Sequence, residues 1–185
     1  MSGFFYDQDS TKIGEWPTFV AQASGVVIGN NKSMLSILNT STTNVVRLRE
    51  LFLVNDQTSA VTGVISQFNL LRMTGHSAGT SITAGLHDTN ETLDAGVTIR
   101  TGGTISGEDA TLYRQWKFSS DEWGAGSQDV ESLQHIFQQS IPRYAPSIAT
   151  KPITLRQNQG VHVKHITNTT AGSFNLIAVF TVEPL

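Results

Sequence analysis

The sequence predicts an all-β protein, a β-sandwich of the jelly-roll type, on three observations. Charged residues make up only 15% of the 185 residues, against about 25% in typical soluble domains. The polar surface comes instead from 18 Ser and 22 Thr, and threonine favours strands. The apolar residues fall in short runs separated by Gly-containing turns. Roughly eight to ten such runs and a single helix candidate fit best the eight strands and two Greek keys of a jelly roll.

The N-terminal segment, residues 1–32, differs from the rest of the chain because its apolar residues show no sustained periodicity. It carries an aromatic set that would suit an anchor: Phe4, Phe5, Tyr6 and Trp16. Two interpretations are open for this segment, an extended arm that reaches a partner or an ordinary first strand. Residues 33–185 form the predicted sandwich domain, since β-type runs and turns alternate over that whole length.

The run 45–54 begins with strict alternation and then becomes wholly apolar, as in a strand that enters a core buried on both sides. The alternation predicts two faces: Val46, Leu48 and Glu50 on one, and Arg47, Arg49 and Leu51 on the other. The two arginines have a glutamate beside them and no interleaved aromatic residue. They therefore indicate a solvated or interfacial face rather than a platform for nucleic acid.

The other runs are also short and are divided by turn signals. They span residues 33–40, 61–74, 80–86, 96–101, 112–118, 153–156, 161–167 and 174–182. The break at 101–104 contains two glycines, which adopt a positive φ without steric cost. One segment, 128–139, has apolar residues at helical spacing, with Asp129 as a possible cap and Pro142 beyond its end. One short helix is therefore predicted there.

Charge and cysteine content exclude several classes of function. A net charge of −3 gives no electrostatic basis for binding nucleic acid or an anionic membrane. The lack of cysteine excludes a disulfide scaffold and thiolate chemistry. The first residues lack the basic and apolar regions of a signal peptide, and no apolar run is long enough to span a bilayer. A soluble protein is therefore expected.

The segment 75–79 matches the G-x-S-x-G pattern of a hydrolase nucleophile, with Ser77 at the serine position. In that motif a strand precedes the serine and a helix follows it, so that the serine lies on a strained turn. The residues after Gly79 are β-branched and interrupted by glycine, which favours a turn between two strands. A serine esterase that uses Ser77 is therefore kept only as a remote alternative.

The histidines do not have the spacing of a metal site. His162 and His165 are three positions apart on a predicted strand, so they point to opposite faces. No H-x-H pair occurs, and an acidic run that begins at Asp7 lacks the Gly and Glu of a calcium loop. No P-loop or G-x-G-x-x-G fingerprint is present. We therefore predict no cofactor, no metal and no catalytic residues.

The closing strands have a familiar pattern. The pattern lies in residues 151–155, 160–163 and 172–181, and the apolar runs in 45–56, 61–75 and 80–88 have a similar spacing. It resembles the pattern of jelly-roll virion proteins of tailed bacteriophages, namely capsid decoration (cement) proteins and head-fibre bases. The resemblance covers roughly residues 33–185 and is one of pattern rather than of a diagnostic motif. The helix-like insertion at 128–139 is not part of the common core of that family.

The resemblance implies a non-enzymatic structural protein on the exterior of a capsid, made in the host cytoplasm. Its partners would be the major capsid protein and further copies of itself, as a homotrimer, with no nucleic acid and no membrane. Phe4, Phe5, Tyr6 and Trp16 would then anchor the arm, because aromatic residues are enriched at interfaces. The alternative from another class is a carbohydrate-binding or receptor-binding jelly-roll module of a virion.

Overall fold

The structure is a computed structural model. It describes residues 5–6, 12–13, 16–56, 65–119, 152–167 and 172–185. The strands in chain order are β1 (Phe5–Tyr6), β2 (Lys12–Ile13), β3 (Thr18–Val27), β4 (Ser33–Asn39), β5 (Asn44–Asn55), β6 (Ile65–Met73), β7 (Gly75–Ser77), β8 (Thr80–Ser81), β9 (Gly85–Leu86), β10 (Val97–Thr101), β11 (Thr104–Ser106), β12 (Leu112–Ser119), β13 (Ile153–Leu155), β14 (Gln159–His165) and β15 (Ser173–Pro184).

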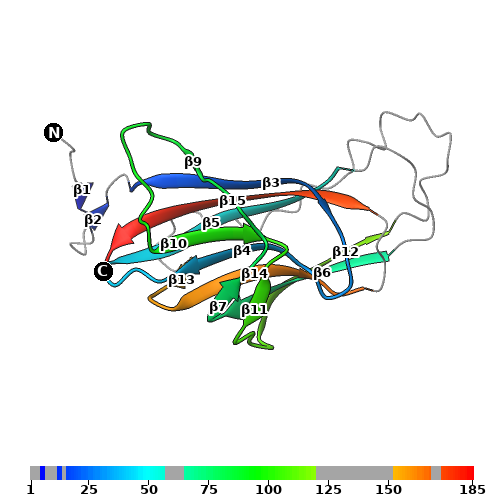
Figure 1. Cartoon of the computed structure of the whole chain (residues 1–185). Coiled ribbons are helices and arrows are strands. Elements are labelled where there is room, and N and C mark those ends of the chain that lie inside the picture. Colours follow the sequence, from blue (N-terminus) through cyan, green and yellow to red (C-terminus); the bar gives the residue numbers. More distant parts are fainter. Residues whose placement is uncertain (1–4, 7–11, 14–15, 57–64, 120–151, 168–171) are drawn as a thin grey trace.

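Two antiparallel sheets pack face to face, which confirms the predicted β-sandwich (Figure 1). The six-stranded sheet has the order β12-β6-β14-β4-β10-β8, and the five-stranded sheet has the order β13-β5-β15-β3-β9. Two small pairs, β11-β7 and β1-β2, complete the described strands. The described residues contain no helix, and none of them forms a helix that could cross a membrane. The helix predicted at 128–139 lies outside the described residues.

The pairing of the strands is nested, and this makes the sandwich a jelly roll. Strand β3 pairs with β15, β4 with β14, β5 with β13 and β6 with β12. The first four strands are thus matched in reverse order by the last four, as in one long hairpin rolled up so that its strands divide between two sheets. This is the arrangement of two Greek keys, and it confirms the predicted fold class.

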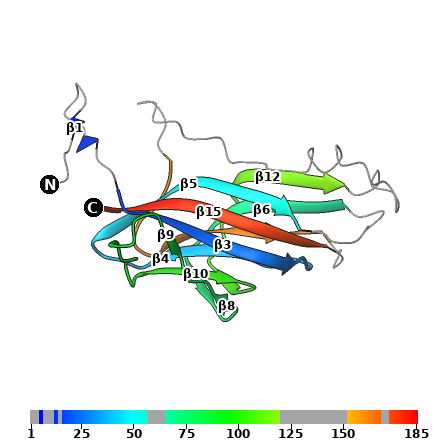
Figure 2. The ribbon, with the colours of Figure 1, turned by 90° about the horizontal axis from the view of Figure 1, so that it is seen from above.

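The core lies between the two sheets and consists of the alternate residues that face inward. Phe68 of the six-stranded sheet packs edge-on against Phe174 of the five-stranded sheet, with 4.7 Å between the ring centroids. Phe19 and Phe180 stack at 5.7 Å on neighbouring strands. Since Phe19 belongs to β3, residues 18–27 of the N-terminal segment form a strand of the sandwich. Both figures show the β1-β2 pair outside the two sheets (Figures 1 and 2).

The connection between β6 and β12 carries five short strands that close one side of the sandwich. Strand β10 pairs with β4 in one sheet, and β9 pairs with β3 in the other. Both β3 and β4 would otherwise be edge strands, with unpaired backbone groups open to another chain. The run 80–86 is therefore split into β8 and β9, which belong to different sheets. The glycine turn at 101–104 is confirmed, with Gly102 at φ 64° between β10 and β11.

The predicted alternation of β5 is correct up to Arg49 and wrong beyond it. Strand β15 pairs Val179 with Glu50 and Phe180 with Leu48, so that Arg49 is an extra residue on β5. Such a β-bulge shifts the alternation by one position. Leu51 is therefore in the core at 2% exposure, whereas Glu50 leaves the face of Val46 and Leu48 and is half-buried on the outer side.

Candidate interaction surface

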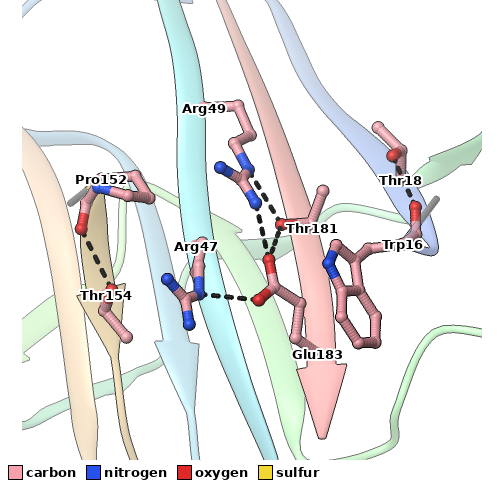
Figure 3. Close-up of polar contacts among 8 residues, drawn as sticks. All are labelled: Trp16, Thr18, Arg47, Arg49, Pro152, Thr154, Thr181 and Glu183. Carbon is pink, nitrogen blue, oxygen red and sulfur yellow. Dashed lines mark hydrogen bonds and ion pairs between the residues drawn. The ribbon is translucent and has the colours of Figure 1, made fainter. Parts of the chain in front are cut away.

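A polar row crosses the outer face of the five-stranded sheet, the face turned away from the core. The strand register brings Thr154 of β13, Arg47 of β5, Thr181 of β15 and Thr18 of β3 side by side. Figure 3 shows these side chains together with their neighbours. Because side chains alternate along a strand, residues from four distant segments meet on this face.

Glu183, two residues beyond Thr181 on β15, contacts two arginines. Its Oε2 is 2.8 Å from Nε of Arg47, and its Oε1 is 2.6 Å from Nη2 of Arg49 (Figure 3). Thr181 donates its hydroxyl to the same Oε1 at 2.8 Å and accepts a hydrogen bond from Nε of Arg49 at 3.0 Å. We call Arg47, Arg49, Thr181 and Glu183 the arginine cluster.

The arginine cluster has more positive than negative charge. The side chain of Glu183 is only 7% exposed, while those of Arg47 and Arg49 are 32% and 33% exposed. Two guanidinium groups thus share one buried carboxylate, so the four residues of the cluster carry about one unit of positive charge. Glu50, which follows Arg49, brings a further carboxylate to the same face. The Nε–H of Arg47 is not aligned for a hydrogen bond, so its contact with Glu183 is an ion pair only.

The bulge in β5 is the local cause of this geometry. Strict alternation alone would place Arg47 and Arg49 on one face, two positions apart along the strand. With the bulge, Arg49 becomes the unpaired residue, and its guanidinium reaches both Thr181 and Glu183 on the neighbouring strand. Bulges commonly re-aim a side chain in this way.

The N-terminal segment leaves the sandwich beside the arginine cluster. Thr18 donates its hydroxyl to the carbonyl of Trp16 at 2.9 Å, and the amide of Val182 donates to the carbonyl of Pro17 at 3.0 Å. The indole of Trp16 lies next to Glu183 and is half-buried (Figure 3). Of the four predicted anchors, Phe4 lies outside the described residues, and Phe5 and Tyr6 are described only as the backbone of β1.

Beyond the arginine cluster the outer face carries apolar side chains with polar ones between them. Ile177 lies between Phe52 and Gln22, and Val179 lies between Glu50 and Val20. The four apolar side chains are half-buried, whereas polar residues usually alternate with the core on the outer face of a sheet. The outer face therefore combines the arginine cluster with partly buried apolar side chains.

Ser77, the serine of the G-x-S-x-G match, lies at the end of β7. Ala78 and Gly79 follow with φ of 53° and 69°, the two positive values of a tight turn, and this turn connects strands of two different sheets. Strand β8 begins directly afterwards at Thr80. The sequence 75–79 is thus a turn between two strands, and the helix that a nucleophile elbow requires after the serine does not follow.

His76 points away from Ser77 and is held by two hydroxyl groups. Its Nδ1 is 2.7 Å from Oγ of Ser36, and its Nε2 is 2.8 Å from Oγ1 of Thr98. Ser36 is completely buried and also donates to the carbonyl of Arg100 at 3.2 Å. Burial lowers the pKa of His76, and the nearby Arg100 lowers it further. The neutral imidazole lies between two hydroxyl groups and holds the connection between β6 and β12 against the six-stranded sheet.

His162 and His165 lie on opposite faces of β14, as the sequence predicted. His165 faces the core, where the centroid of its ring is 5.1 Å from that of Phe68 and its Nδ1 is 2.7 Å from the carbonyl oxygen of Gly29. Burial lowers its pKa. His162 faces outward but is covered, with 1% exposure. Its Nε2 is 3.1 Å from Oε2 of Glu108 without being aligned for a hydrogen bond, and burial lowers its pKa to about 4.

In the part of the chain that the structure describes, no three His, Asp or Glu side chains are grouped so that they could hold a metal ion. The sequence identified Arg47 and Arg49 as a possible interfacial pair but missed their partner Glu183. The only signal for it was a lone acid in the polar positions of the last strand, and nothing local relates that acid to residues more than 130 positions earlier.

No family model, no curated protein and no solved structure matches the chain.

Proposed function

We propose that this chain is a non-enzymatic structural protein of a virion, which decorates or cements the exterior of a phage capsid. In this proposal the β-sandwich forms an oligomer, a homotrimer, and the N-terminal segment attaches it to the major capsid protein or to a neighbouring copy. Binding to the assembled capsid would stabilise that state by mass action.

The observation that supports the proposal is where the N-terminal segment leaves the sandwich. Trp16 and Pro17 are hydrogen-bonded to β3 and β15, while the β1-β2 pair before them lies outside both sheets. The segment departs beside the outer face that carries the arginine cluster and half-buried apolar side chains. Such a mixture of aromatic, arginine and apolar groups is typical of protein interfaces.

Removal of residues 1–15 tests the role of the segment. We expect the shortened chain to keep its melting temperature, since it retains Trp16 and β3, and to lose at least tenfold in co-sedimentation with capsids built from the major capsid protein encoded near this chain. Removal of 1–32 is not an equivalent variant, because it deletes β3 from the sandwich. Equal co-sedimentation of the shortened and full chains would contradict attachment through the segment.

Light scattering and electron microscopy test the rest of the proposal. Multi-angle light scattering of the purified chain should give the mass of a trimer, about three times the 20.1 kDa of the chain. Electron microscopy of native particles should show the sandwich on the capsid exterior. A strict monomer that does not bind capsids would overturn the proposed function.

A further inference from the structure

The arginine cluster is left with hydrogen-bond donors that nothing in the described chain uses. Arg47 meets Glu183 through Nε alone, so its two terminal nitrogens, Nη1 and Nη2, have no partner among the described residues. Arg49 uses Nε and Nη2, which leaves Nη1. The end of a guanidinium is a planar fork of N–H groups that matches the two oxygens of a carboxylate.

We propose that Arg47 and Arg49 bind an aspartate or glutamate side chain from an acidic segment of the protein to which this chain attaches. The inference rests on the proposed function, since it names the chemistry of that partner. It assigns the arginine cluster as the contact and Arg47 as the residue that holds the incoming carboxylate.

The charge of the cluster favours a carboxylate over a phosphate. The four residues of the cluster carry about one positive charge, which a single carboxylate neutralises, and Glu50 beside Arg49 adds a negative charge to the same face that opposes a more highly charged ligand. A phosphate monoester brings close to two negative charges, and the second of them would face the buried carboxylate of Glu183 without compensation. Acidic side chains are also abundant on protein surfaces, so an ordinary acidic segment supplies the ligand.

Arg49 is already held in place, which favours binding. Its guanidinium contacts Glu183 at 2.6 Å and Thr181 at 3.0 Å, and Thr181 in turn donates to Glu183 at 2.8 Å. Arg47 is restrained by its ion pair with Glu183 at 2.8 Å. Part of the side-chain freedom that binding would cost is therefore already lost.

The surrounding hydroxyl groups favour a protein segment over an acidic sugar. Recognition of a sugar uses several polar groups that are free to bond its hydroxyls. Here the hydroxyl of Thr154 is donated to the carbonyl of Pro152 at 3.0 Å, that of Thr18 to the carbonyl of Trp16, and that of Thr181 to Glu183. The row therefore offers a carboxylate fork with few other free donors.

The first test uses the full wild-type chain and the peptide acetyl-(Glu)6-amide as the probe. Nitrogen-15 spectra of the arginine Nε–H groups are recorded during a titration at low salt. We expect the signals of Arg47 and Arg49 to shift together and to saturate, while that of Arg156, which is exposed beyond β13, shifts much less. Uniform shifts of all arginines, or none at Arg47, would overturn the inference without the need for any variant.

Three variants then separate geometry from charge, with affinity for the same peptide measured by calorimetry. R47Q should bind at least fivefold more weakly, and R47K should lose most of the same affinity because an ammonium group has no planar fork. The matched control R156Q removes the same charge from an exposed turn and should change affinity by less than twofold. Equal losses in R47Q and R156Q, or full affinity in R47K, would contradict the proposed contact.

Two further outcomes keep this inference distinct from the proposed function. If a hexagalacturonate oligosaccharide shifts Arg47 and the peptide does not, the ligand is a glycan and the inference is wrong. If R47Q co-sediments with capsids as the wild type does, the inference fails while the proposed function stands. If the peptide binds as expected but the chain neither trimerises nor binds capsids, the proposed function fails instead.

Discussion

The two outer faces of the sandwich differ in how far their apolar side chains are buried. The outer face of the six-stranded sheet is covered by the molecule itself, since Leu38, Leu71 and Met73 point away from the core and are still buried. The outer face of the five-stranded sheet keeps Phe52 and Ile177 half-buried beside the arginine cluster. Among the described residues, one outer face is thus buried by the chain itself, and the other remains partly exposed.

The insertion between β6 and β12 is the reason for this difference. Strands β7 and β11 form an antiparallel pair that lies beside the six-stranded sheet (Figure 1), where His76 bonds Ser36 and Glu108 covers His162. Coverage by its own chain costs no association entropy. Among the described residues, no strand lies over the outer face of the five-stranded sheet in the same way.

The largest expected effect comes from truncation of one apolar residue on each face. Leu71→Ala should lower the free energy of unfolding by about 3 kcal/mol, because the side chain is buried under the insertion and its loss leaves a cavity. Ile177→Ala on the other face should cost about 1 kcal/mol, since the side chain is only half-buried. Urea denaturation of both variants measures the contrast, and equal losses would show that the two faces are covered alike.

The covered face should also make stability sensitive to acid. His162 is buried with a pKa lowered to about 4 from 6.5, so the unfolded chain takes up a proton before the folded chain does. Its contribution is fully present above pH 6.5 and is lost as the pH falls from 6.5 toward 4. Between pH 7 and 4.5 this amounts to about 2 kcal/mol.

The variant His162→Gln should flatten that part of the stability profile, whatever its effect at neutral pH. The lowered pKa values of His76 and His165 act in the same direction and should leave a smaller slope. The control His87→Gln changes an exposed histidine and should retain the wild-type profile. Chemical denaturation at a series of pH values measures these slopes, and an unchanged slope in H162Q would contradict the role given to His162.

The smallest expected effect concerns the arginine cluster. Glu183→Gln keeps an acceptor for Thr181 but removes the charge that two arginines share, and it should destabilise the chain by about 1 kcal/mol because the arginines are partly in solvent. Glu91→Gln, in the loop between β9 and β10, is a control for the loss of one negative charge. Thermal unfolding at low and high salt measures both. A loss of several kcal/mol in E183Q would mean that the cluster mainly serves the fold.

The sequence predicted the parts of the fold that depend on local chemistry. The apolar runs at 33–40, 112–118 and 174–182 are strands, because a period of two and β-branched residues favour extended backbone wherever they occur. The turn that follows Ser77 is a turn because Gly79 takes the positive φ that it requires. His162 and His165 lie on opposite faces for the same local reason, their odd spacing on one strand.

The partner of the arginines lay beyond local reasoning. Arg49 and Glu183 are 134 positions apart, and they meet only because β5 and β15 are neighbours in one sheet. The bulge at Arg49 depends on the register of that pairing, which no pattern within β5 records. The burial of His162 likewise requires Glu108, which belongs to the insertion between β6 and β12.

By itself, then, the sequence determined that the chain is an all-β protein with strands, turns and two outward arginines in identifiable places. Backbone preference and alternation act over a few residues and can be read directly from them. The tertiary structure decided which outer face is covered and how Arg49 leaves the regular alternation. It also placed one buried carboxylate between two cations. These features follow from the nested pairing of strands far apart in the chain, where long-range packing selects one register among many that local chemistry would allow.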